Sequence, residues 1–155
     1  MRIQLVLTVL LTMLSANVEA GDSEKPREHY LCIAEQRNGF WHDKTSKHWN
    51  STTFNNPSKY VISRSTQPTA AFQITVVGKS APRDWCKEGF NEAGFLSCGM
   101  IWGDFTYNKN NGRFIRTSPF GYIEVGEDLP TGGEKKITDD ETNTPYMEIG
   151  KCSLF

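Results

Sequence analysis

The chain has 155 residues, which is enough for one domain and rarely for two. Its 17 Lys+Arg and 18 Asp+Glu give a formal net charge of −1, which argues against a nucleic-acid-binding protein because such proteins carry a basic excess. Aromatic residues make up 12% of the chain, so it can build a core and does not have the composition of a disordered protein.

The N-terminal residues 1–20 have the pattern of a secretory signal peptide. A short positive start precedes an apolar run over residues 3–14, and Val18 and Ala20 occupy the −3 and −1 positions that signal peptidase accepts. An N-terminal membrane anchor is the alternative, but a bilayer-spanning helix needs about 20 apolar residues. We therefore predict cleavage before Gly21, a periplasmic or secreted protein, and no membrane span after cleavage.

Four cysteines follow this leader. An even number of cysteines in an exported chain predicts two disulfides in an oxidising compartment. Cys86 and Cys98 flank a turn-rich stretch that can fold back on itself, whereas Cys32 opens the first apolar segment and Cys152 lies near the C-terminus. Of the three possible pairings we favour Cys32–Cys152 with Cys86–Cys98. A zinc site is the weaker alternative, because the chain has no C-x-x-C pair.

A series of short segments with the pattern of strands follows a flexible lead-in over residues 21–29. The clearest is 71–77, where Phe72, Ile74 and Val76 share one face. The expected strands are 30–34, 40–42, 48–54, 60–64, 71–77, 95–100, 104–108, 113–117, 121–125 and 146–149.

The best helical candidate, residues 84–92, is interrupted by Gly89. We therefore predict a single all-β domain over residues 30–155. It should be a small sandwich or flattened barrel of about eight to ten short antiparallel strands and hairpins, held by two disulfides.

Two predicted hairpins share a pattern of aromatic, two residues, Asx-Lys, four residues, aromatic. The matched positions lie 65 residues apart: Phe40 and Phe105, Asp43 and Asn108, Lys44 and Lys109, Trp49 and Phe114. Asx suits the start of each turn, because its side chain caps the following backbone N–H groups. Two unrelated hairpins with common turn chemistry are the favoured interpretation, and a duplicated half is the alternative. Alternation places Phe40 and Phe105 in the core and Trp41 outside.

Four motifs stand out in the second half of the chain: Cys-Lys-Glu-Gly-Phe-Asn-Glu-Ala-Gly at 86–94, Tyr-Asn-Lys-Asn-Asn-Gly-Arg-Phe at 107–114, Gly-Tyr at 121–122, and Thr-Pro-Tyr-Met-Glu-Ile-Gly-Lys-Cys-Ser at 144–153. They resemble a family of small exported bacterial proteins of unknown function. The resemblance covers most of the mature chain and implies a bacterial periplasmic or secreted protein, but no activity. Leu154 departs from the pattern, in which Pro is expected.

Residues that could carry chemistry form no convincing constellation. His42, Asp43 and His48 could meet across one hairpin and bind a metal, but a third good ligand is not obvious, so we expect exposed histidines and neither a metal site nor a cofactor. No Gly-x-Ser-x-Gly elbow supports a nucleophilic triad. Carboxylate pairs for glycoside hydrolysis could come from Asp104, Glu124, Glu127 or Glu148.

Two regions of charged residues remain. Glu124 and Glu148 alternate with apolar residues, which predicts that both lie on the water-exposed side of strands. The polar run over residues 126–144 lacks an apolar period and predicts a solvated, mobile loop.

These features favour an exported, non-enzymatic binding protein of the periplasm or extracellular space. Its partner would be a protein, as for an inhibitor or immunity protein, or an envelope glycan, with no nucleic acid; the sequence leaves the oligomeric state open. Trp41, Trp49 and Arg113 are the candidate binding residues, because binding hot spots favour Trp, Tyr and Arg. Trp41 and Arg113 are expected to meet in one patch. The alternative function is a small secreted hydrolase that acts on an envelope polymer.

Overall fold

The structure, a computed structural model, describes residues 28–100, 103–123, 138–142 and 144–155. The predicted signal peptide, its cleavage site and most of the lead-in therefore lie outside the described residues.

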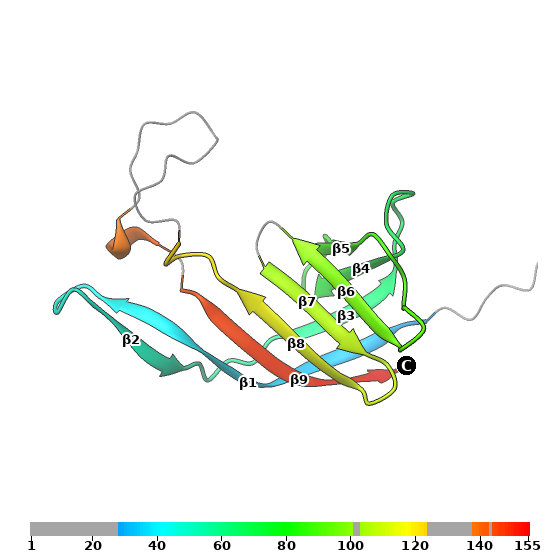
Figure 1. Ribbon diagram of the computed structural model, residues 1–155, viewed down its shortest axis with the longest axis horizontal. Helices are drawn as coiled ribbons and strands as arrows, with labels where there is room; N and C mark the ends of the chain where they lie inside the picture. The colour runs from blue at the N-terminus through cyan, green and yellow to red at the C-terminus, as the bar shows by residue number, and fades with distance from the viewer. Residues whose placement is uncertain (1–27, 101–102, 124–137, 143) are drawn as a thin grey trace, which may run out of the picture.

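The described residues form one antiparallel sheet of nine strands and a short 3-10 helix (Figure 1). The elements are β1 (Tyr30–Asp43), β2 (His48–Thr53), β3 (Lys59–Arg64), β4 (Phe72–Val76), β5 (Asp84–Cys86), β6 (Phe95–Met100), β7 (Gly103–Asn108), β8 (Arg113–Ser118), η1 (Asp139–Glu141) and β9 (Tyr146–Leu154). The strand order is β5-β4-β3-β1-β9-β8-β7-β6, and β2 pairs with β1 only. The all-β prediction is confirmed.

The sheet curls into a nearly closed barrel, and two disulfides fasten it. Cys86–Cys98 joins β5 to β6, the two strands at the ends of the hydrogen-bonded order. Cys32–Cys152 joins directly paired residues of β1 and β9. Both predicted pairings are confirmed, and they are consistent with folding in an oxidising compartment.

Aromatic side chains fill much of the barrel interior. Tyr60 makes edge contacts with Phe105 and Phe114, whose rings stack on each other with centroids 5.1 Å apart. Tyr30 and Tyr107 pack edge-to-face beside them. Large buried aromatics dominate the hydrophobic stabilisation of a small core. The barrel interior is therefore packed with side chains.

Strand β1 is long because it belongs to two parts of the molecule. Its residues 30–33 pair with β3 inside the barrel wall, and its residues 38–43 pair with β2. A register shift around Glu35 separates the two parts and bends the strand. As a result, the β1–β2 hairpin extends beyond the barrel (Figure 1).

The β1–β2 and β7–β8 hairpins turn in the same way, as their shared sequence pattern predicts. Lys47 N–H donates to the Asp43 carbonyl at 2.7 Å, and Gly112 N–H donates to the Asn108 carbonyl at 2.9 Å. The donor residue has a positive φ in both, 58° at Lys47 and 70° at Gly112. The strands that flank the two hairpins differ, so local turn chemistry accounts for the likeness.

Two local expectations are wrong. Phe105 is buried with 1% exposure, but its counterpart Phe40 is 53% exposed, because the β1–β2 hairpin has left the barrel. Residues 121–123, the described part of the strand expected at 121–125, form a turn. Residues 84–92, in which Gly89 argued against a helix, begin with strand β5.

We expect removal of Cys32–Cys152, by changing both cysteines to serine, to cost more stability than removal of Cys86–Cys98. The two bridges close 120 and 12 residues of sequence, which predicts losses of about 5 and about 3 kcal/mol from chain entropy. Urea unfolding of the two double variants measures both losses. The reverse order would mean that the barrel depends on the β5–β6 bridge for closure in the folded state, and would contradict the entropic account.

Candidate functional site

In the middle of strands β8 and β9, one charged side chain of each strand faces the barrel interior and the adjacent apolar side chains face outward. Arg116 is 3% exposed and Glu148 is fully buried. Their neighbours Ile115, Met147 and Ile149 are 40%, 46% and 42% exposed. The prediction that Glu148 lies on the water-exposed side is therefore wrong. Charged and apolar residues do lie on opposite faces of β9, but the apolar face is the one that points to solvent.

Glu148 lies at the centre of a buried polar network. The Tyr60 hydroxyl donates a hydrogen bond to Glu148 Oε2, and Ser58 Oγ donates to Oε1 at 2.7 Å. Arg116 Nη1 donates to the Tyr60 hydroxyl at 2.8 Å, and its Nη2 lies 3.9 Å from Asp84 Oδ2. Each buried charge thus has a partner, as the cost of desolvating a charge requires.

Burial raises the pKa of two groups of this network. Desolvation raises the pKa of Tyr60 to about 12, against the opposing effect of the Arg116 charge. The Tyr60 hydroxyl therefore stays protonated and donates a hydrogen bond to Glu148. Desolvation also raises the pKa of Asp84, while the charge of Arg116 acts in the opposite direction.

Arg37 connects the network to the projecting hairpin. Its Nε lies 3.6 Å from Glu148 Oε1, and its guanidinium lies 3.7 Å from the ring centroid of Tyr146 and 4.9 Å from that of Phe54. Gly39 allows β1 to lie close to the backbone at the start of β9, since a Cβ at this position would meet the Pro145 carbonyl oxygen at 2.2 Å. The direction in which the hairpin leaves the barrel is therefore held from inside.

A groove of about 790 Å³ lies where this hairpin meets β8 and β9. We call it the outer groove. Its lining residues come from β1, β2, β8, β9 and the residues beside them: Asn38, Gly39, Phe40, Ser51, Thr52, Thr53, Thr117, Ser118, Pro119, Pro145, Tyr146 and Met147. All of them are uncharged. Seven of the twelve carry a hydroxyl or amide group, and the other five are Gly, Pro, Phe and Met. Concave surfaces of this size are typical of binding sites.

Four of the exposed apolar residues lie in or beside the outer groove. Phe40 and Met147 line it, and Ile149 pairs directly with Ile115 next to Met147 on the same face. Asn38 pairs with Met147, which places Phe40 one step further along that face. A contiguous exposed apolar patch on a small protein marks an interaction surface.

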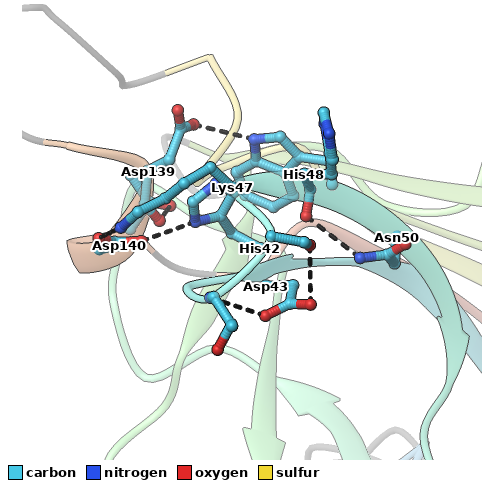
Figure 2. Close-up of polar contacts among 11 residues, drawn as sticks. His42, Asp43, Lys47, His48, Asn50, Asp139 and Asp140 are labelled. Carbon is cyan, nitrogen blue, oxygen red and sulfur yellow. Dashed lines mark hydrogen bonds and ion pairs between the residues drawn. The ribbon is translucent and has the colours of Figure 1, made fainter.

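A second cluster lies at the hairpin tip (Figure 2). His42 Nδ1 lies 2.9 Å from Asp140 Oδ1, and Lys47 Nζ forms an ion pair with the other oxygen of that carboxylate. Trp49 Nε1 donates to Asp139 Oδ1 at 2.9 Å. The described end of the polar run 126–144 is therefore docked on the hairpin; residues 126–137 and 143 lie outside the described residues.

The hydrogen bond from Lys47 is the main reason that the pKa of Asp140 is lowered, and the charges of Lys47 and His42 act in the same direction. Because the pKa of Asp140 is lowered on docking, the contact stabilises the docked segment fully at pH values above the ordinary pKa of 3.8. That stabilisation is lost as the pH falls through the folded value. This contact is consequently stable at neutral pH.

The three predicted binding residues are not brought together. Trp41 is 43% exposed, as expected, but lies on the face of the hairpin opposite Phe40. Trp49 is half-buried. Arg113 is exposed and pairs with Lys151, which pairs with Ile33, eight residues before Trp41 along β1. Since eight strand residues span about 26 Å, the expected patch of Trp41 with Arg113 does not form.

None of these three residues lines the outer groove, and their part in binding remains a prediction. Sequence reasoning missed the groove residues. The sequence signal for them is the alternation of apolar and charged residues in β9, where Met147 and Ile149 flank Glu148. This alternation separates the two faces of the strand but does not say which face is buried.

The residues considered for a metal site or for catalysis do not form one either. Asp43 accepts hydrogen bonds within its own turn, from Thr45 N–H and Ser46 Oγ, and His48 is exposed. The His42 side chain is only 6% exposed, so the expectation of exposed histidines is wrong at this position. The described residues contain no group of three potential metal ligands. Of the four carboxylates considered for hydrolysis, Glu124 and Glu127 lie outside the described residues. Asp104 lies outside the barrel and Glu148 inside it, so these two do not form a catalytic pair.

Comparisons of the chain with models of protein families, with curated proteins and with solved structures found no match. Within the described part of the chain, no helix is long and apolar enough to cross a membrane.

We expect Lys47→Met to raise the pKa of Asp140 toward 3.8, because the main cause of its lowering is removed. Carboxyl ¹³C resonances followed through a pH titration measure this directly. Lys44→Met is the matched control, since Lys44 lies in the same turn but outside the ion pair. Equal shifts in the two variants would contradict the assigned contact.

Proposed function

We propose that the chain is an exported, non-enzymatic binding protein of the periplasm or extracellular space that binds a protein partner through the outer groove. The observation that carries this proposal is the exposed apolar surface of Phe40, Met147, Ile149 and Ile115, next to a groove of about 790 Å³. A folded chain gains nothing in its own stability from leaving such side chains in water.

The chemistry of the groove favours a protein over an envelope glycan. Its exposed apolar residues are Phe40 and Met147, and the neighbouring Ile115 and Ile149 add aliphatic surface. Aliphatic surface of this kind matches the apolar core of a protein interface. An inhibitor-like or immunity-like role, in which a small stable domain covers part of another protein, fits this surface. The two disulfides and the predicted signal peptide support action outside the cytoplasm.

A small secreted hydrolase is the alternative, and one observation favours it. The His42 side chain is 6% exposed and its Nδ1 faces Asp140, which is how a general base is oriented in many hydrolases. Its side chain contacts Asp140 and the ring of Trp49. A His42→Gln variant that loses the ability to degrade cell-envelope polymers would support the hydrolase over the binder.

Phe40→Ser and Met147→Ser should each weaken binding of the protein partner by about tenfold or more, as loss of a central apolar contact does. The partner is captured from an extract of the cell envelope or culture medium on the immobilised chain, purified, and titrated by calorimetry. Val77→Ser is the matched control, because Val77 is 49% exposed and does not line the groove.

Unchanged affinity in both groove variants would contradict the proposal. So would binding of soluble peptidoglycan fragments that Phe40→Ser abolishes, with no protein partner captured, since that result would assign the groove to a glycan.

A further inference from the structure

We infer that the partner supplies an extended, uncharged segment that adds to the sheet as a strand along the outer edge of β2. This inference rests on the proposed function, because it specifies how a protein partner engages the outer groove. It depends on a different observation, the backbone of β2 rather than the apolar side chains.

Strand β2 has one paired and one open edge. All six of its residues pair with β1 in continuous register, from Asn38 with Thr53 to Asp43 with His48. Among the described residues, no other strand pairs with β2. The barrel strands at the ends of the sheet order, β5 and β6, are instead joined by a disulfide. Within the described part of the chain, the outer edge of β2 is therefore closed neither by strand pairing nor by a disulfide.

The hydrogen-bond pattern shows which backbone groups point outward. Phe54 N–H donates to the Arg37 carbonyl at 2.9 Å, so this pair is of the hydrogen-bonded type. Alternation in an antiparallel ladder then directs the backbone of Thr52 toward β1 and that of Ser51 and Thr53 away from it. These outward N–H and C=O groups form a template for a further strand.

The sequence and register of β2 also contain none of the features that block an edge from within the strand. Its sequence, His-Trp-Asn-Ser-Thr-Thr, contains no Lys, Arg, Asp, Glu or Pro, and its register with β1 shows no bulge. Proteins normally block an open edge with charges, proline or a bulge, because an unblocked edge pairs with other chains. The absence of all three from β2 indicates an edge that is kept available.

The groove beside this edge indicates the chemistry of the incoming segment. Ser51 and Thr53 line the outer groove on the face of Phe40, so alternate side chains of an added strand would lie next to them. Every residue that lines the groove is uncharged. A charged side chain placed there would lose water without gaining a partner, so the segment is neutral at these positions.

Ser51→Pro tests the inference. Proline at position 51 removes an N–H group that points away from β1, so the hydrogen bonds between β2 and β1 stay intact. An edge strand tolerates proline at such positions. Ser51→Ala is the matched control, since it removes the hydroxyl and keeps the N–H. The probe is a linear twelve-residue peptide selected on the immobilised wild-type chain from a random display library.

We expect selected peptides to be uncharged at alternate positions and to bind Ser51→Ala within about twofold of wild type. Binding to Ser51→Pro should fall at least tenfold, while circular dichroism shows the fold unchanged. Amide hydrogen exchange should slow at Ser51 and Thr53 when the peptide binds. This protection gives a second readout in the wild-type chain, independent of how well the proline variant folds.

Several outcomes would overturn the inference. Peptides that bind Ser51→Pro as tightly as wild type but fail on Phe40→Ser would leave groove binding standing and remove strand addition. Failure to select any peptide would remove strand addition and count against the proposed groove as well. Peptides that bind both Phe40→Ser and Ser51→Pro as tightly as wild type would have the same consequence. A dimer in sedimentation that Ser51→Pro dissociates would assign the β2 edge to a second copy of this chain.

Discussion

The buried carboxylate of Glu148 is the interaction on which the rest of the structure depends. It receives hydrogen bonds from Tyr60 of β3 and from Ser58, and it lies beside Arg37 of β1. Through Tyr60 it is linked to Arg116 of β8. One side chain of β9 therefore connects three other strands, and its contact with Arg37 extends to the base of the projecting hairpin. A buried charge is stable only with such partners, so their positions are tightly coupled.

The inward charge of β9 has a consequence for its outer face. Because successive residues of a strand point to opposite sides, placing Glu148 inside places Met147 and Ile149 outside. The polar network and the exposed apolar surface are two sides of the same strand. The outer groove and the open edge of β2 lie on the hairpin that this network orients, which joins the rigid interior of the barrel to the surface proposed for binding.

Much of the fold could be predicted from the sequence, and the candidate site could not. The Cys86–Cys98 spacing and the repeated Asx turns are local signals, and one disulfide and both hairpins follow from them. The even number of cysteines then leaves Cys32 and Cys152 to pair with each other. A period of two predicts a strand but does not say which face is buried. Arg37, the cation that lies beside Glu148, is 111 residues away in sequence, and only the fold brings the two together. Phe40 has the local pattern of buried Phe105, and only the departure of β1 from the barrel exposes it.

The most direct test of this account compares the free energies of unfolding of Glu148→Gln and Ile149→Ser, two neighbours on β9 that face opposite sides. The account predicts that Glu148→Gln costs about 2–5 kcal/mol, because it disrupts a buried hydrogen-bonded charge. Ile149→Ser should cost under about 1 kcal/mol, because that side chain faces water. The opposite order, with the isoleucine variant the less stable, would show that β9 buries its apolar face and would contradict the account.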